Sequence, residues 1–236
     1  MQNVVEKIQN RIEAACRRSG RDVGDVTLIG ASKTVSAARL LEFAAGGLQN
    51  VGENYVQEAL NKQRELQTSS TRCDLKWHFI GALQSNKARD VVGKFSLIHS
   101  VDRIKLAKSL NDEARKIQLV QDILLQVNIG EESTKSGVAP DDILKLAREV
   151  SSLENVRICG LMCLPPAFQN PEEVRALFKK MCELRDEMRC EMTSSTRSST
   201  PELSMGMSGD FEIAIEEGAT LIRVGTALFG AREKIA

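Results

Sequence analysis

Short apolar runs alternate with helical patterns along the chain, and this alternation constrains the fold more than any other feature. We predict strands over residues 26–33, 48–54, 76–83, 95–101, 122–129, 156–164, 202–207 and 220–229. Helices are predicted over residues 2–18, 37–45, 55–60, 103–117, 171–192 and 210–217, with shorter ones near residue 86 and after residue 140. Strands that alternate with helices are typical of parallel sheets. The pattern therefore predicts an α/β fold, a single (β/α)8 TIM barrel domain over residues 1–236 with an extra N-terminal helix.

An open, doubly wound sheet is the competing architecture. Such a sheet is expected to carry a glycine-rich turn after its first strand, and Ser32-Lys33-Thr34 offers none. The polar tract at 193–200 is too short for a domain boundary, and we expect it to be a flexible surface loop. The barrel is therefore favoured.

The composition excludes several classes of protein. Lys+Arg and Asp+Glu both number 32, and this balance argues against a nucleic-acid-binding surface. No apolar run is long enough to span a membrane, and the first residues lack a secretory signal. The 6 cysteines form no Cys-x-x-Cys pair and there are 2 histidines, so we expect no metal site. We predict a cytoplasmic protein.

Lys33 closes the first predicted strand. A lysine at the carboxyl end of a barrel strand points into the mouth where ligands bind. Apolar neighbours disfavour its charged form, which makes it a candidate Schiff-base nucleophile. A lysine that reaches into solvent at a strand end is the alternative.

The ends of the last two predicted strands favour an anion site. The run from Ser204 to Asp210 leads into a helix, with Ser208 or Asp210 as its cap, and small residues there leave backbone N–H groups free for a phosphate. Gly225 and Thr226 add a second close backbone approach and a hydroxyl. A plain helix cap with a tight turn is the alternative interpretation.

Arg223 lies within the apolar run of the last predicted strand. Alternation places it on the same side as Leu221 and Gly225. A buried guanidinium needs a partner, which is either a glutamate in an ion pair or an acceptor atom of a ligand. A lysine, a phosphate cradle and a buried arginine together match pyridoxal 5′-phosphate (PLP), with Arg223 facing the pyridine nitrogen.

Several motifs then resemble one family over essentially the whole chain. They are Ala31-Ser32-Lys33, Gly52-Glu53-Asn54-Tyr55, Trp77-His78-Phe79-Ile80-Gly81, Gln84-Ser85-Asn86-Lys87, the run Ser204–Ser208 and Arg223-Val224-Gly225-Thr226. The chain resembles the pyridoxal phosphate homeostasis protein family, which is similar to the N-terminal barrel of alanine racemase standing alone.

The resemblance implies a set of cofactor-binding residues. It implies a Schiff base on Lys33, phosphate contacts from Ser208, Gly225 and Thr226, and a pyridine-nitrogen contact from Arg223. Three further residues near the ends of their strands complete the set that we expect to bind the cofactor, namely Asn54, Met162 and Ser204.

The resemblance also implies a protein that carries, buffers and delivers PLP, with no catalytic residues. A two-base racemase needs a second base opposite the lysine, which alanine racemase takes from another domain. We expect no such domain here, and the only tyrosine is Tyr55. We expect a monomer that serves apo-PLP enzymes. The alternatives are a weak racemase using Lys33 as base and a Schiff-base aldolase acting on phosphorylated sugars.

Overall fold

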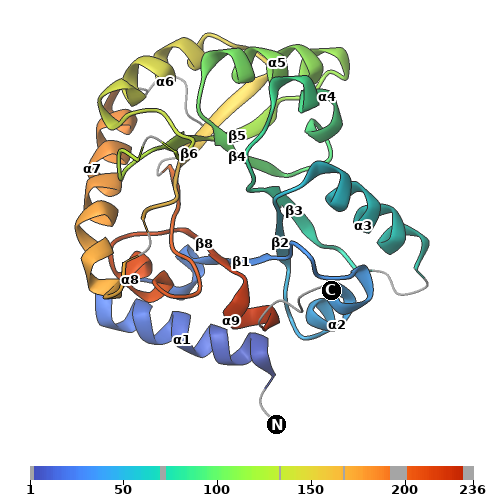
Figure 1. Cartoon of the computed structure of the whole chain (residues 1–236), viewed down its shortest axis with the longest axis vertical. Helices are drawn as coiled ribbons and strands as arrows, with labels where there is room; N and C mark the ends of the chain where they lie inside the picture. The colour runs from blue at the N-terminus through green and yellow to red at the C-terminus, as the bar shows by residue number, and fades with distance from the viewer. Residues whose placement is uncertain (1–2, 70–72, 133, 167, 192–200, 231–236) are drawn as a thin grey trace.

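A computed structural model describes residues 3–69, 73–132, 134–166, 168–191 and 201–230. Within these residues, parallel strands close into a barrel in chain order, and β8 pairs with β1 (Figure 1). The strands are β1 (Thr27–Ala31), β2 (Asn50–Glu53), β3 (Lys76–Phe79), β4 (Leu97–Val101), β5 (Gln121–Val127), β6 (Val156–Cys163), β7 (Glu202–Ser204) and β8 (Leu221–Val224). The predicted fold class, an α/β TIM-like barrel, is confirmed.

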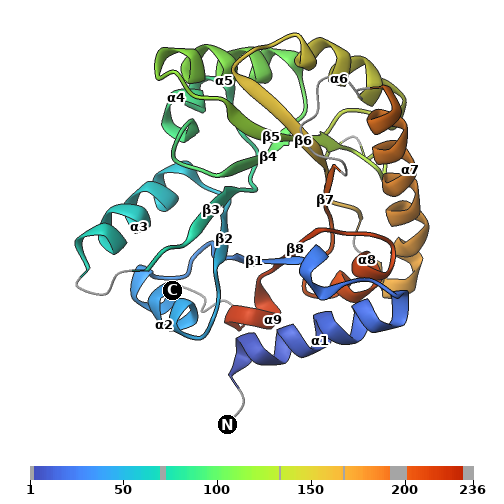
Figure 2. The ribbon, with the colours of Figure 1, turned by 180° about the vertical axis from the view of Figure 1, so that it is seen from behind.

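The helices form a ring outside the strands, seen from both ends in Figures 1 and 2. They are α1 (Val4–Ser19), α2 (Ala37–Ala45), α3 (Val56–Thr68), α4 (Ala88–Val91), α5 (Ile104–Lys116), α6 (Ile143–Ser151), α7 (Arg175–Glu191), α8 (Phe211–Glu216) and α9 (Thr226–Phe229). Short 3-10 turns at Pro140–Asp142 and Pro171–Val174 precede α6 and α7. Proline suits such first turns because its missing N–H would have no helical partner there. Among the described residues, no helix is long and apolar enough to cross a membrane.

The extra N-terminal helix packs beside α8 (Figure 1). Asn3 caps the start of α1 by accepting a hydrogen bond from the Val5 N–H, and Gly20 ends the helix in the left-handed region at φ 66°. Arg11 and Arg18 each lie 2.7 Å from a glutamate of α8. The predicted N-terminal helix is therefore confirmed, and it completes the outer ring next to the short α8 and α9.

The core has two layers, as the alternation along each strand requires. Most buried apolar side chains pack between the strands and the helices. A smaller cluster fills the barrel interior and consists of Ile29, Leu97, Leu124, Met162 and Leu221. Because Leu221 faces inward, Arg223 faces inward too, and its Cα is in register with Ile29 of β1. The predicted direction of the Arg223 side chain is confirmed.

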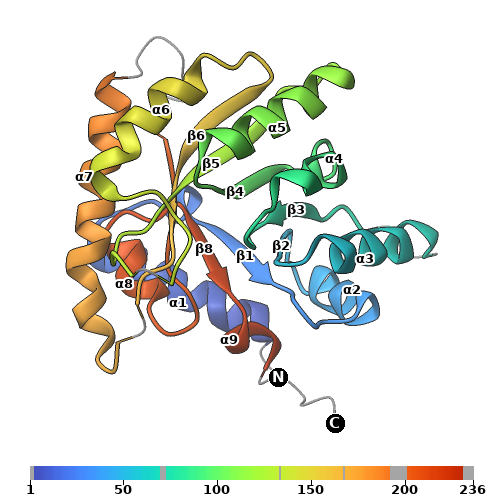
Figure 3. The ribbon, with the colours of Figure 1, turned by 45° about the horizontal axis from the view of Figure 1, so that its top comes forward.

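Several strands end earlier than predicted, and two of these differences shape the site. Strand β8 ends at Val224, and residues 226–229, expected to continue it, form α9 (Figure 3). The backbone breaks at Gly225, where φ is −107° and ψ is −84°. Strand β1 stops at Ala31, and Thr34 takes a left-handed φ of 68° in the turn that follows. The polar tract at 193–200 lies outside the described residues.

Candidate functional site

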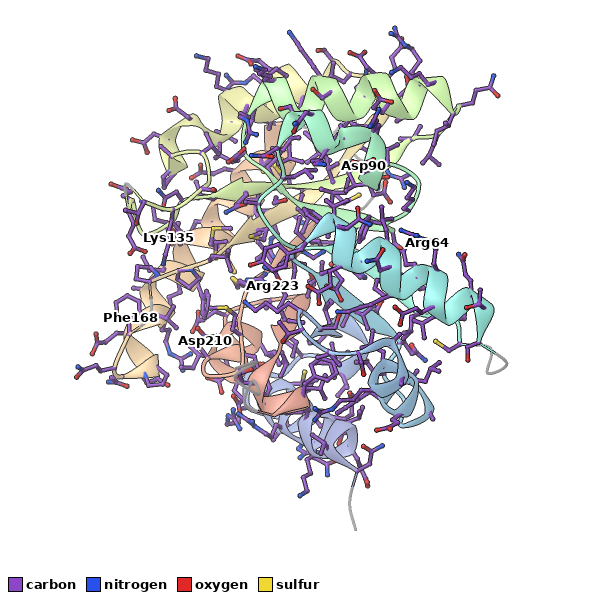
Figure 4. The ribbon with its side chains drawn as sticks, turned by 45° about the vertical axis from the view of Figure 1, so that its right-hand side comes forward. Arg64, Asp90, Lys135, Phe168, Asp210 and Arg223 are labelled. Atoms are coloured by element: carbon purple, nitrogen blue, oxygen red, sulfur yellow. The ribbon has the colours of Figure 1, made fainter. Side chains whose placement is uncertain are left out.

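A cavity of about 610 Å³ opens at the carboxyl ends of β1 and β8. Figure 4 shows Arg223 near the centre of the molecule and Asp210 close to it in that view. The cavity wall combines three cationic side chains with small residues. Its lining residues are Ala31, Lys33, Thr34, Val35, Arg39, Met207, Ser208, Gly209, Arg223, Gly225, Thr226, Phe229 and Gly230.

Lys33 projects from the turn after β1 into this cavity. Ser32 before it is fully buried, and Lys33 itself is half-buried. A half-buried amine on a cavity wall can reach a ligand while its stem packs against the wall. The structure therefore places Lys33 on the wall of this cavity, at the mouth of the barrel as predicted from the sequence.

A buried ion cluster holds the backbone on both sides of Lys33. Lys62 of α3 donates to the Ser32 carbonyl at 2.7 Å, and Glu58 accepts from the Thr34 N–H at 2.6 Å. Lys62 also bonds Glu58 at 2.6 Å and Glu53 at 2.7 Å. These contacts stabilise the left-handed φ of Thr34, which would otherwise cost energy in a non-glycine residue.

Glu53 is the least exposed member of this cluster. Its side chain is 0% exposed, and burial raises the pKa of its carboxyl while hydrogen bonds from Lys62 and Ser32 oppose that shift. The Ser32 hydroxyl donates to Glu53 Oε1 at 2.6 Å. Among the described residues, Glu53 Oε2 has no hydrogen-bond partner. The ion pair with Lys62 is therefore important for keeping this carboxylate buried.

Ser208 joins the β7 loop to the start of α9. Its hydroxyl oxygen accepts from the Gly225 and Ala227 N–H groups, both at 3.2 Å. Asp210 is the cap residue of α8, and its carboxylate accepts from the Met207 N–H at 2.5 Å. Of the two residues predicted to cap α8, Asp210 takes that position and Ser208 contacts α9 instead. Hydroxyls and N–H groups thus gather at one end of the cavity, an arrangement suited to an anion.

Arg223 forms the floor of the cavity and is 3% exposed. Its Nη1 donates to Ser204 Oγ at 2.5 Å, and its Nη2 donates to the Cys163 carbonyl at 2.8 Å. Both acceptors are neutral oxygens. The predicted alternative, an ion pair with a glutamate, is therefore not found among the described residues. Burial lowers the pKa of this guanidinium, and nearby Asp210 opposes the shift.

The structure brings together most of the residues predicted from the sequence. Lys33, Ser208, Arg223, Gly225 and Thr226 all line the cavity. The remaining three, Asn54, Met162 and Ser204, do not line it.

Ser204 lies one hydrogen bond behind Arg223, and Met162 belongs to the interior cluster beneath it. Asn54 is half-buried just after β2 and does not line the cavity. Its backbone packs so closely on Gly81 that a Cβ there would lie 2.1 Å from the Asn54 carbonyl oxygen. A cofactor contact from Asn54 or Met162 stays a prediction.

Sequence reasoning missed several residues of the site. Arg39 lines the cavity and donates to the Phe229 carbonyl at 2.6 Å. Glu58 and Lys62 act on the Lys33 turn from α3. Their spacing of four residues indicates only an ordinary helix ion pair, so no local signal predicted the contact with the turn.

Comparisons with known proteins identify the family. Residues 5–233 match the family described as alanine racemase, N-terminal domain. A pyridoxal phosphate homeostasis protein of Aquifex aeolicus is 48% identical over 229 residues, which cover 97% of both chains. The chain belongs to the pyridoxal phosphate homeostasis protein family. Its Escherichia coli K12 relative is 37% identical over 230 residues, covering 96% of this chain and 94% of the relative.

Solved structures agree with this assignment. PipY of Synechococcus elongatus, solved with PLP bound, is 40% identical with a TM-score of 0.80, covering 94% of this chain and 100% of PipY. An unknown protein from Bifidobacterium adolescentis is 33% identical with a TM-score of 0.85, covering 96% and 93%. An alanine racemase of Clostridium difficile is 13% identical with a TM-score of 0.67, covering 96% of this chain and 56% of the racemase, a likeness that shows the fold alone. The family predicted from the motifs is confirmed.

Proposed function

We propose that this chain binds PLP through a Schiff base on Lys33 and carries, buffers and delivers the cofactor, with no catalytic turnover. The observation that carries the proposal is the shared cavity wall of Lys33 and Arg223, reached from the neighbouring strands β1 and β8. The solved structure of PipY, a family member, with PLP bound supports the same ligand.

The residues of the cavity fit the chemistry of PLP. When bound, PLP supplies an aldehyde for a lysine amine and an aromatic ring that withdraws electrons. Lys33 offers the amine, and Ser208 and Thr226 offer hydroxyl groups to a phosphate, which would also take the Gly225 N–H from Ser208 Oγ. Arg223 is a buried cation with N–H groups left over from its two protein hydrogen bonds, which it can present to a ring nitrogen.

The cavity wall also supports a carrier over an enzyme. Among its described lining residues there is no Tyr, His, Cys, Asp or Glu that could act as a second base opposite Lys33. Tyr55 is 63% exposed at the start of α3 and does not line the cavity. A cation at the ring nitrogen keeps that nitrogen unprotonated, which weakens the ring as an electron sink.

Titration of the purified protein with PLP tests the binding step. We expect a visible absorption band from the lysine-linked cofactor, abolished in Lys33→Ala. The matched control Lys108→Ala, on the exposed face of α5, should keep the band. A band of wild-type strength in Lys33→Ala would refute the assignment of the lysine.

Two further assays separate a carrier from an enzyme. A carrier should transfer PLP to an apo-PLP enzyme faster than PLP exchanges through free solution. A racemase would instead exchange the α-proton of amino acids in heavy water at enzymatic rates, dependent on Lys33. Such exchange would overturn the carrier proposal, and a colourless, PLP-free protein that cleaves sugar phosphates would favour the aldolase.

A further inference from the structure

A line of hydrogen bonds crosses the barrel interior and ends at Arg223. His78 Nε2 lies 3.2 Å from Asn50 Oδ1, and His78 Nδ1 lies 3.0 Å from His99 Nε2. His99 Nδ1 lies 2.8 Å from Ser204 Oγ, which accepts from Arg223. These five residues come from β2, β3, β4, β7 and β8. The line therefore connects the amino end of β2, where Asn50 lies, with the cavity at the carboxyl ends.

The chemistry of Arg223, at one end of this line, favours one direction for its hydrogen bonds. Arg223 can only donate, so Ser204 Oγ accepts from it, and the Ser204 hydroxyl hydrogen points to His99 Nδ1. His99 then carries its hydrogen on Nε2 and donates to His78 Nδ1. His78 also carries its hydrogen on Nε2 and donates to the Asn50 carbonyl oxygen.

The opposite direction satisfies fewer groups. It would make Ser204 Oγ accept from both His99 and Arg223, and the hydroxyl hydrogen would then have no acceptor within the line. An unmade hydrogen bond costs more in a buried site than a made one contributes. The forward direction is therefore the favoured one, with both imidazoles as Nε2–H tautomers.

Both imidazoles are neutral in this arrangement. His99 is 0% and His78 6% exposed. Burial lowers the pKa of His78 to about 4, with a smaller contribution from Lys76. Burial also lowers the pKa of His99 well below its usual value, with help from His78 and Arg223. Cys163 and Asp210 are the other titratable groups that act on Arg223. A charged His99 could neither accept from Ser204 nor lie near the guanidinium without repulsion.

We propose that His78 and His99 are positioning residues for Arg223. Together with Asn50 they orient Ser204, whose neutral oxygen accepts from the guanidinium. Arg223 thereby stays a cation and keeps N–H groups directed to the cavity. Changes at Asn50 are thereby coupled to the ligand that Arg223 meets. That the ligand atom at Arg223 is the ring nitrogen of PLP rests on the function proposed above.

The first test needs no ligand. The full chain contains 2 histidines, so all imidazole signals in a nitrogen-15 NMR spectrum of the protein report on this line. At neutral pH we expect two neutral Nε2–H tautomers in the PLP-free protein. A protonated imidazole, or an Nδ1–H tautomer at either position, would overturn the proposal.

The second test uses two variants of His99 and the PLP-loaded protein. Phenylalanine removes the acceptor for Ser204, whereas the amide of glutamine keeps one acceptor and one donor. His99→Phe removes the hydrogen bond to Ser204, which is the partner of the Arg223 cation. We therefore expect this variant to weaken PLP affinity by about tenfold and to shift the visible band. His99→Gln should restore both. Wild-type spectrum and affinity in a folded His99→Phe protein would contradict the proposal.

The third test changes the far end of the line, where Asn50 is half-buried. In Asn50→Asp the new carboxylate accepts from His78 Nε2–H and raises the pKa of His78. We expect the visible band of the loaded protein to change with the same pH midpoint as the His78 NMR signals. If His78 titrates while the band stays constant, no coupling exists and the proposal fails.

These outcomes separate the two proposals of this site. If no lysine-linked band forms, the PLP function fails, while the NMR tautomers of the free protein still decide the direction of the line. If the band forms on Lys33 but the tautomers or the His99 variants contradict the expectation, the function stands and the positioning role is wrong.

Discussion

Removal of the Lys62 ammonium should lower the free energy of unfolding, because it breaks the ion cluster behind Lys33. In Lys62→Met, Glu53 stays buried at 0% exposure and loses its cation, and the Ser32 carbonyl loses its donor. Breaking a buried pair by removing one partner typically costs about 3–5 kcal/mol. We expect a loss in that range, because Glu53 Oε1 keeps only the Ser32 hydroxyl and Oε2 has no partner among the described residues.

Urea unfolding of the PLP-free protein measures this loss. The matched control is Lys116→Met, which breaks an exposed lysine–glutamate pair of 2.6 Å and should cost at most about 1 kcal/mol. The double variant Glu53→Gln/Lys62→Met removes both charges and should recover more than half of the loss. A Lys62→Met protein within about 1 kcal/mol of wild type would refute the reasoning.

Loss of either Lys62 or Glu58 should slow PLP loading. Lys62 and Glu58 hold the peptide groups on either side of Lys33, so their loss frees the turn that presents the amine. Stopped-flow absorption should show slower formation of the visible band in Glu58→Gln, which keeps Lys62 and Glu53 paired. Band formation at the wild-type rate in that variant would contradict the role of the cluster.

Three further predictions follow from single features of the structure. Folding lowers the pKa of His78 from 6.5 to about 4, so the unfolded chain binds more protons than the folded protein between these pH values. The urea midpoint should therefore fall as the pH drops from 6.5 toward 4. A flat profile would contradict the burial of the imidazole. Gly160→Ala places a Cβ 2.0 Å from the Glu202 carbonyl at φ 151°, and thermal unfolding should show a loss of about 1–3 kcal/mol rather than a neutral change. Ser208→Ala should raise the Kd for PLP about tenfold in absorption titrations and weaken competition by inorganic phosphate equally; unchanged values would exclude a phosphate contact.

The barrel could be predicted from the sequence because alternation of strands and helices is a property of the local pattern. The end of β8 could not. Residues 221–229 form one apolar stretch, and a short apolar run fits a strand or a buried helix equally well. Gly225 marks the true boundary, because its carbonyl accepts the first hydrogen bonds of α9, and the contact of Ser208 with the Gly225 and Ala227 N–H groups is a tertiary one.

The candidate site could be predicted where it depends on strand ends. Lys33 and Arg223 were found because parallel strands end at one edge and side chains alternate along them. The Ser32–Lys62 contact joins residues 30 positions apart, and the His78–His99 contact depends on the placement of β3 beside β4. Neither leaves a local signal in the sequence, because both arise from tertiary packing.

Borohydride reduction followed by peptide mapping tests the central claim most directly. The purified protein is loaded with PLP, reduced, digested and analysed by mass spectrometry. We predict that the reduced pyridoxyl group lies on Lys33, and that Lys33→Ala loses the modification under the same conditions. A stoichiometric label on another lysine with Lys33 unmodified would contradict the account.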